Sequence, residues 1–231
     1  MSITIKTVMQ GAVLVAGLMT GAAVQAVTVP GVYSTGFGAG GASLAAGNGV
    51  ADANYRLTAT TSATQPVGTQ AVTFYNFNYA ADTATSRWIS YTADTSQMGY
   101  NANFTFTTTF DLTGFNAATA RLSGFVGADN EATVLLNGVA IGGVYGYRRE
   151  TFTSLTAFST LDPDLFVSGV NRLDVVLHNI DLIAAVRIDQ LTLTADAGAV
   201  PEPATWAMMV LGFGTIGGAM RRRQTMRLAN A

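Results

Sequence analysis

One stretch of strict alternation constrains this chain more than any other feature. Phe104, Phe106, Thr108, Phe110 and Leu112 share one parity, while threonines and an aspartate occupy the positions between them. A period of two is typical of a β-strand with one face on a core and the other in water. The chain is therefore expected to build a sheet with one buried face.

Short apolar runs with turn residues between them extend this sheet. Thr, Val, Phe and Tyr are abundant while Lys and Glu are scarce, a composition that favours strands. Asn137-Gly138 predicts a tight hairpin, because this pair readily adopts the positive φ angles of a type I′ turn. Further strands are predicted at 71–79, 87–91, 120–128, 133–136, 139–141, 151–158, 172–178 and 185–194, the last with a bulge near 189–190.

The strand count predicts an all-β fold, an antiparallel β-sandwich or jelly roll. The sandwich domain is placed at residues 72–196. Residues 27–71 are rich in Gly, Ala, Ser and Thr and show no strong period, so they are interpreted as the N-terminal segment of the same body. Residues 31–49 are expected to be either loose or a weak strand with loops.

The first 26 residues have the pattern of a secretory signal peptide. Lys6 gives a small positive region, residues 8–23 are apolar, and Val24-Gln25-Ala26 offers small residues before a cut after Ala26. This pattern predicts export; the alternative is an N-terminal anchor that is never cut.

The last residues, 197–231, have the order of a sorting tail. An apolar, Gly-rich run at 204–220 is expected to form a helix of about 26 Å, slightly shorter than a bilayer core of about 30 Å. The basic residues behind it would stay on the cytoplasmic side. The residues that define the pattern are Pro201, Glu202, Pro203, Trp206, Arg221, Arg222 and Arg223.

This order resembles the PEP-CTERM sorting signal of Gram-negative bacteria. The resemblance implies a transmembrane sorting helix and, as partner, an exosortase, a membrane protease that removes the tail. It also implies a position in the inner membrane during processing and afterwards at the cell surface or in the extracellular matrix. The alternative is a plain C-terminal anchor that is never cleaved.

Charge and cysteine content exclude several classes of function. Residues 27–199 hold seven arginines and thirteen acidic residues, a formal charge of about −6. Nucleic acid is therefore not expected as a partner, because phosphate binding needs clustered basic charge. The chain has no cysteine, so no disulfide can form and stability must come from the core.

Four stretches between 104 and 189 resemble the galactose-binding-like jelly roll of carbohydrate-binding modules. The resemblance implies that fold and, only by analogy, a sugar ligand. The stretches are Phe-Thr-Phe-Thr-Thr-Thr-Phe-Asp-Leu-Thr-Gly at 104–114, Gly-Ala-Asp-Asn-Glu-Ala-Thr-Val-Leu-Leu-Asn-Gly at 127–138, Phe-Val-Ser-Gly-Val-Asn-Arg-Leu-Asp-Val-Val-Leu at 166–177 and Val-Arg-Ile-Asp at 186–189.

Catalytic and metal chemistry find few residues in this sequence. His178 is the only histidine, no Gly-x-Ser-x-Gly element is present, and the usual zinc ligand sets cannot be assembled. The acidic turns at 129–131 and 162–164 are interpreted as solvated or capping residues, with Ca²⁺ as the alternative. We therefore expect a protein that is not an enzyme and that has no cofactor.

A sugar site needs an aromatic platform beside amide and carboxylate groups. The segment 142–149 combines two tyrosines and two arginines on a glycine-rich connection, a setting that often carries binding. Trp88 has core packing as its alternative, and both tyrosines have rim packing. The candidate ligand-binding residues are Tyr145, Tyr147, Arg148, Arg149, Trp88, Asp129 and Asn130.

Two functions are consistent with these features. The first is an exported surface or matrix protein that binds or organises exopolysaccharide in a biofilm. The second is a structural surface protein that self-associates and has no small ligand. An accessory of a glycan-active enzyme is a more distant third.

Overall fold

A computed structural model describes residues 25–198, except 64, 66, 96 and 97, together with residues 203–228. The predicted signal peptide lies almost wholly outside the described residues, as do Pro201 and Glu202 of the tail. The strands are β1 (Ala26–Thr28), β2 (Ala51–Thr60), β3 (Gln70–Thr73), β4 (Ile89–Ser90), β5 (Ala102–Asp111), β6 (Phe115–Asp129), β7 (Glu131–Leu136), β8 (Val139–Val144), β9 (Thr156–Thr160), β10 (Val170–Asn179) and β11 (Ala185–Ala197). The helices are α1 (Glu150–Thr153), α2 (Pro203–Leu228) and two short 3₁₀ turns, η1 (Ala39–Gly41) and η3 (Pro163–Leu165).

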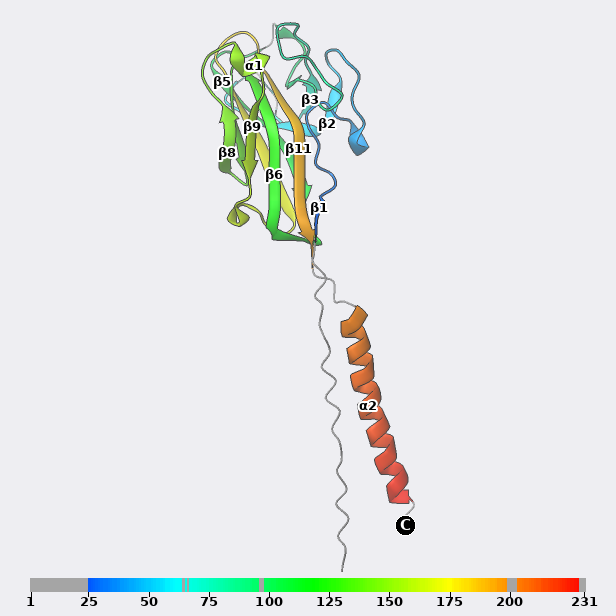
Figure 1. Cartoon of the computed structure of the whole chain (residues 1–231). Helices are drawn as coiled ribbons and strands as arrows, with labels where there is room; N and C mark the ends of the chain where they lie inside the picture. Colours follow the sequence, from blue (N-terminus) through cyan, green and yellow to red (C-terminus); the bar gives the residue numbers. More distant parts are fainter. Residues whose placement is uncertain (1–24, 64, 66, 96–97, 199–202, 229–231) are drawn as a thin grey trace, which may run out of the picture.

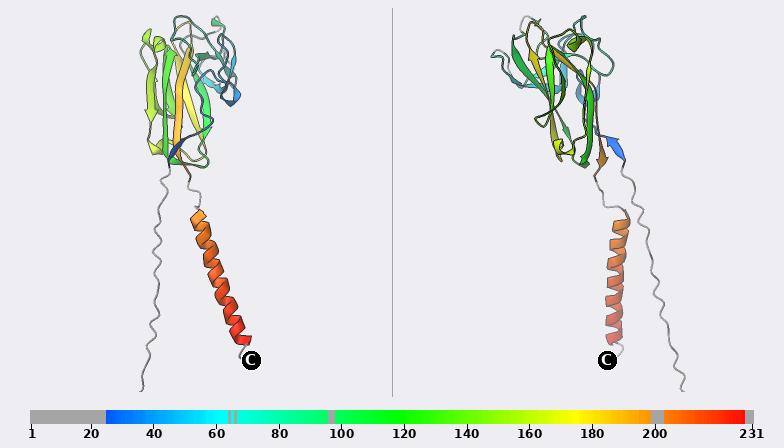
Figure 2. Two further views of the ribbon diagram at one scale, coloured as in Figure 1. Left: turned by 45° about the vertical axis from the view of Figure 1, so that its right-hand side comes forward. Right: turned by 60° about the vertical axis from the view of Figure 1, so that its left-hand side comes forward.

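The strands form one antiparallel sheet that folds over on itself. Its order is β8-β7-β10-β5-β2-β3-β4-β11-β6-β9, with β1 added to β11. The fold brings its two ends together, because Gly142 of β8 lies directly against Phe158 of β9. The result is a nearly closed, two-layered body, as the two views of Figure 2 show. The predicted antiparallel all-β architecture is confirmed.

Side chains from both layers fill the space between them. On β5, Phe104, Phe106, Thr108 and Phe110 are buried, and so is Leu112 directly after it, which confirms the predicted inward parity. β10 pairs with β5 and contributes two leucines and one valine to the same core. These buried apolar side chains drive folding, since each contributes about 1.5–3 kcal/mol on transfer from water.

Local sequence signals place several turns correctly. Asn137 and Gly138 have φ angles of 48° and 87° and join β7 to β8. In β11 the register with β6 shifts between Asp189 and Thr192, and Gln190 has a φ of 49°, so the predicted bulge is confirmed. The bulge moves the side chains after it by one position, so that residues on both sides of it face the core.

One strand was not predicted from the sequence. Residues 51–60, interpreted as part of a weakly structured segment, form β2, which lies between β5 and β3. The prediction failed because a register irregularity changes the parity within this strand: Asp52 is buried on one parity, whereas Tyr55 and Leu57 are buried on the other. The Asp52 carboxylate is buried because it accepts hydrogen bonds from the backbone N–H groups of Gly36, Asn54 and Tyr55.

Three predicted strands are shorter than expected; the one at 87–91 keeps only Ile89–Ser90, as β4. The strand at 71–79 ends at Thr73, because the Asn76 side chain and carbonyl accept hydrogen bonds from the N–H groups of Asn78 and Tyr79 and so build a turn. The strand at 151–158 begins only at Thr156. Before it, the hydroxyls of Thr151 and Ser154 donate to carbonyls of the preceding turn and stabilise α1 instead.

The two termini of the body lie at the same end. β1 pairs with the last part of β11, with Ala26 opposite Asp196, so a cut after Ala26 would leave Val27 and Thr28 in the strand. α1 and the loops that follow β3 and β10 lie at the opposite end (Figure 1). The sorting tail therefore leaves the body at the end remote from these loops.

The C-terminal tail forms α2, which includes the whole predicted helical run at 204–220 and continues past Arg221. None of the helices in the described part of the chain combines the length and the apolar character that crossing a bilayer requires. This finding differs from the transmembrane helix predicted there, because four glycines and two threonines dilute the apolar side chains of the run.

Candidate functional site

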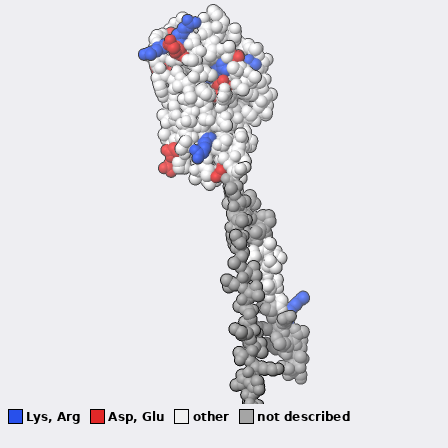
Figure 3. Space-filling view, viewed as in Figure 1, with Lys and Arg blue, Asp and Glu red and all other residues white. Residues whose placement is uncertain are grey.

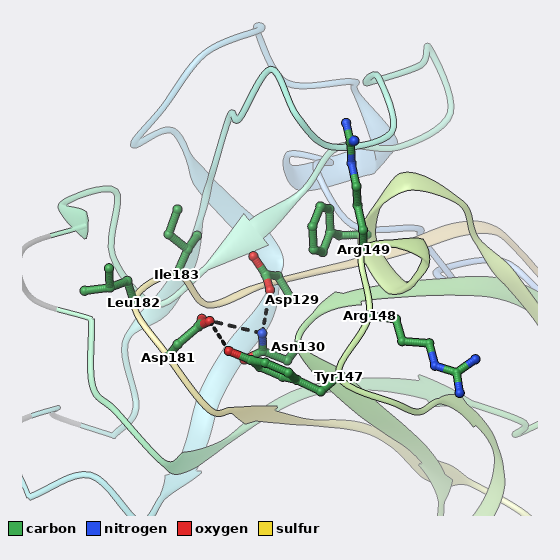
Figure 4. Close-up of a pocket in the computed structure, with 9 residues that line it drawn as sticks. Asp129, Asn130, Tyr147, Arg148, Arg149, Asp181, Leu182 and Ile183 are labelled. Carbon is green, nitrogen blue, oxygen red and sulfur yellow. Dashed lines mark hydrogen bonds between the residues drawn. The ribbon is translucent and has the colours of Figure 1, made fainter.

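A cavity of about 460 Å³ opens among the loops at the end remote from the tail. Three segments meet there: the turn between β6 and β7, the connection from Tyr147 into α1, and the loop between β10 and β11. Figure 4 shows the side chains around it. The lining residues are Asp129, Asn130, Tyr147, Arg148, Arg149, Phe152, Asp181, Leu182 and Ile183.

Asn130 holds two of these segments together. Its side-chain oxygen accepts a hydrogen bond of 2.7 Å from the backbone N–H of Ile180. Its amide nitrogen donates to Asp129 Oδ1 at 2.9 Å and to Asp181 Oδ1 at 3.5 Å (Figure 4). One buried amide therefore orients two carboxylates and fixes the distance between them.

Two tyrosines donate to these carboxylates from opposite sides. The buried Tyr79 hydroxyl donates to Asp129 Oδ2, and the exposed Tyr147 hydroxyl donates to Asp181 Oδ2, each at 2.5 Å. The hydrogen bond to Asp181 raises the pKa of Tyr147. Tyr147 is 58% exposed, so one face of its ring remains open beside a fixed carboxylate.

The two carboxylates differ in environment. Burial raises the pKa of Asp129 to about 6; the hydrogen bond from Tyr79 lowers it and the charge of Asp181 raises it. Asp129 is therefore partly protonated in mildly acidic solution, when it can donate as well as accept a hydrogen bond. Burial, followed by the charge and hydrogen bond of Asp129, raises the pKa of Tyr79 far enough to keep its hydroxyl protonated.

The rim combines positive charge with apolar surface. Arg148 and Arg149 precede α1, and their carbonyls accept hydrogen bonds from its first turn. Their guanidinium groups point away from the carboxylate pair in Figure 4 and form no hydrogen bond or ion pair with any described residue. Phe152, Leu182 and Ile183 form the apolar wall. The site can thus accept hydrogen bonds at its floor and bury an apolar face at its side.

The structure brings together five of the seven residues that the sequence nominated for ligand binding: Asp129, Asn130, Tyr147, Arg148 and Arg149 all line this cavity. The other two lie elsewhere. Tyr145 lines a separate hollow beside Glu131 and His178, and its hydroxyl donates to the carbonyl of Gly142 at 3.4 Å. Trp88 is 1% exposed and packs in the core, the alternative that its sequence also allowed.

Sequence reasoning missed Asp181 and the apolar wall. Asp181 follows the end of β10, and β10 pairs with β7 so that His178 lies opposite Glu131. That register carries residue 181 to the turn at 129–130. A correct pairing of these two strands was therefore the signal that could have identified it.

Of the acidic residues in the turns at 129–131 and 162–164, only Asp129 lines the cavity. Glu131 faces away from the cavity and accepts a hydrogen bond from the backbone N–H of Gly146. Asp162 accepts from the N–H of Asp164 and caps η3. Within the described part of the chain, no group of three or more His, Cys, Asp or Glu side chains is placed to hold a metal ion.

The charged side chains on the face shown in Figure 3 are few and gather mainly near the two ends of the body, with a wide uncharged area between them. One of these groups lies over the end that carries α1. On this face the cavity end therefore carries charges of both signs.

Comparison with known protein families identifies a sorting motif in the tail. Residues 199–224 match the PEP-CTERM protein-sorting motif. The sorting signal predicted from the sequence is confirmed. A PEP-CTERM motif marks a chain for export and for processing by an exosortase, a membrane protein. The motif covers the tail only and says nothing of what the body binds.

The body has weak likenesses to solved structures. No curated protein matches the chain. Two solved cyclases from Fischerella sp. TAU, one in complex with (3Z)-3-(1-methyl-2-pyrrolidinylidene)-3H-indole, are 15% and 14% identical with TM-scores of 0.44 and 0.41; each covers 76% of this chain and 100% of its own. A family 35 carbohydrate-binding module from an environmental isolate is 14% identical, with a TM-score of 0.24, over 44% of this chain and 74% of its own. At TM-scores this low the likenesses carry no argument, and function is argued from the site.

Proposed function

We propose that this is an exported surface or matrix protein, without enzymatic activity, whose body binds extracellular polysaccharide in the cavity of Asp129, Asn130, Tyr147 and Asp181. The observation that carries the proposal is the arrangement of this site. Asn130 orients two carboxylates next to an exposed tyrosine ring and an apolar wall. A sugar ring presents the complementary surface, with hydroxyls around its edge and an apolar C–H face.

The position of the cavity supports the same reading. It lies at the end of the body remote from the sorting tail (Figure 1). While the tail is held by the membrane or by an exosortase, this end is the one that can face outward. We propose that the body then organises exopolysaccharide in the biofilm of a Gram-negative bacterium, after α2 has served as the membrane-held tail.

Calorimetry tests the binding directly. The full-length chain, purified in a detergent without a sugar headgroup, is titrated with the producing organism's exopolysaccharide, with and without Ca²⁺. We expect saturable heat, weakened strongly by Asp181→Asn, because the Tyr147 hydroxyl and the Asn130 amide then lose their charged acceptor. Tyr145→Phe is the matched control, since Tyr145 lies outside this cavity.

Three outcomes would change the assignment. No heat under either condition, together with assembly that depends on protein concentration, would favour a structural, self-associating surface protein. Release of new reducing ends from the polysaccharide, abolished by Asp129→Asn, would show an enzyme. A requirement for Ca²⁺ would show that the carboxylates act through a cation.

A further inference from the structure

A second cavity, of about 250 Å³, lies beside the first and is not part of the binding site proposed above. The loop between β3 and β4 forms most of it. Tyr75 is 55% exposed and Phe77 is 82% exposed on this loop. The lining residues are Ala46, Tyr75, Asn76, Phe77, Tyr79, Ala80, Ala81, Asp82 and Trp88.

The loop that carries these rings is held in place at several points. The backbone N–H of Tyr75 donates to the side chain of Asn48 at 2.5 Å. Further along, the buried guanidinium of Arg187 donates to the carbonyl of Ala81 at 2.6 Å. The backbone N–H of Ala80 donates to the carbonyl of Phe152 in α1 at 2.8 Å. The two exposed rings thus stand on a loop that is tied to the core and to α1, which reduces the entropy lost on binding.

The two cavities share a wall. The centroid of the Tyr79 ring lies 5.0 Å from that of the Phe152 ring and 4.8 Å from that of the Trp88 ring. Phe152 lines the first cavity, Tyr79 lines the second, and the Tyr79 hydroxyl reaches Asp129 in the first. A ligand long enough to extend over the rings of Tyr79 and Phe152 can therefore occupy both cavities.

The second cavity favours an uncharged ligand. Its one charged lining residue, Asp82, is already paired with Arg87, with 3.1 Å between Oδ2 and the guanidinium nitrogen. What it offers is two aromatic faces and the polar groups of Asn76 and the backbone. Aromatic faces bind the C–H face of a sugar without requiring charge on it.

We infer that Tyr75 and Phe77 form a second, stacking subsite, so that the body binds consecutive residues of one neutral polysaccharide chain across the wall of Tyr79 and Phe152. This inference rests on the proposed function. It adds the class of glycan, a neutral linear chain, and a preference for longer oligosaccharides. It assigns binding to two residues that the first cavity does not contain.

The experiment measures affinity against chain length. The full-length chain in the same detergent is titrated with neutral oligosaccharides from cellulose, mannan and galactan, each as a series from mono- to hexasaccharide. For the series that binds, we expect affinity to rise with length by roughly tenfold for each further sugar that stacks on an aromatic ring, which corresponds to about 1.4 kcal/mol. In the double variant Tyr75→Ala/Phe77→Ala the rise of affinity with chain length should disappear.

Control variants separate the two levels of the proposal. Tyr100→Ala removes another exposed tyrosine, which lines neither cavity, and should keep the length dependence. Asp181→Asn should weaken every member of the series, monosaccharides included. Because Tyr75 and Phe77 are exposed, the double variant should fold, and its thermal unfolding checks this.

Each contrary result has a definite meaning. A length dependence that survives in the double variant, or affinity that does not grow with length in the unmodified chain, overturns the second subsite and leaves the first cavity as the site. The absence of binding by any oligosaccharide or by the exopolysaccharide overturns the proposed function and this inference together.

Discussion

Replacing Tyr79 with phenylalanine removes one hydroxyl and leaves the buried Asp129 carboxylate without the donor to its Oδ2 atom. In the native fold this hydroxyl donates to Asp129 Oδ2, and the ring packs between Trp88 and Phe152. Phenylalanine keeps the ring and its packing. The variant therefore isolates the interaction of the hydroxyl with Asp129.

The expected cost depends on pH. A hydrogen bond to an ionised group is worth about 1.5–3 kcal/mol, and one between neutral groups about 0.5–1.5 kcal/mol. The pKa of Asp129 is about 6, so the carboxylate is ionised at pH 8 and mostly protonated at pH 5. We expect Tyr79→Phe to lose about 2 kcal/mol of unfolding free energy at pH 8 and about 1 kcal/mol at pH 5.

The dependence of this loss on pH also predicts how the substitution changes the pKa of Asp129. One unit of pKa equals about 1.4 kcal/mol, so a difference of about 1 kcal/mol between the two pH values equals a rise of about 0.7 unit in the pKa of Asp129. Asp129 in the variant should therefore titrate about 0.7 unit higher than in the native chain. Asp181→Asn should shift it downward instead, because the charge of Asp181 raises this pKa. Two variants on either side of one carboxyl thus move its pKa in opposite directions.

The same pKa determines how the stability of the native chain changes with pH. Folding raises the pKa of Asp129 from an ordinary value of about 3.9 to about 6. Its contribution to stability is therefore fully present below about pH 3.9 and is lost as the pH rises through about 6. Taken alone, this group makes the body more stable in mildly acidic solution than at pH 8.

Denaturant unfolding and NMR measure the two quantities separately. Trp206→Phe provides a background in which Trp88, beside Tyr79, is the sole reporter of fluorescence. The carboxyl carbon of Asp129 reports the pKa. Tyr91→Phe is the control: its hydroxyl accepts from the backbone N–H of Gly99 rather than donating to a carboxylate, so its cost should not vary with pH. A pH-independent loss in Tyr79→Phe, or equal shifts of the Asp129 pKa in both variants, would refute the reasoning.

Two further predictions concern the frame that holds the site. Gly142→Ala should lose about 1–3 kcal/mol in denaturant unfolding, because its Cβ would lie 2.5 Å from that of Phe158 where the sheet closes; Gly212→Ala, with open space around it, should lose nothing, and equal effects would contradict the closure. Arg187→Met should lose about 3–5 kcal/mol, because it leaves Asp189 partly unpaired in the interior. Adding Asp189→Leu should restore part of that loss, and a further loss in the double variant would show that the ion pair is not the cause.

Local patterns predicted the parts of the fold that depend on neighbours in sequence. The inward face of β5 was predicted because alternation alone decides which side chains share a face. The Asn137-Gly138 hairpin was predicted because its backbone angles suit few other residue pairs. The sorting tail was predicted because its residues act in linear order and need no body around them.

β2 and α1 show where local patterns fail. Asp52 interrupts the apolar parity of β2 and is buried only because backbone N–H groups from a distant loop and from its own strand surround it. Thr151 and Ser154 have a composition that suits a strand, yet their hydroxyls bond to the preceding turn. In β2 a hydrogen bond from another loop helps to bury a polar residue, and in α1 local side-chain bonds to the backbone outweigh the strand propensity.

The sequence by itself determined that this chain is exported, that its body is an antiparallel sheet without disulfides, and that the segment 142–149 contributes Tyr147, Arg148 and Arg149 to the site. Only the tertiary structure decided which carboxylates meet there. Asn130 and Asp181 are 51 positions apart and are joined through the register of β7 on β10. Tyr79 and Asp129 are 50 positions apart, and the aromatic packing between two loops brings them together. Pairings of this kind depend on strand order and on how the sheet closes, which no local pattern encodes.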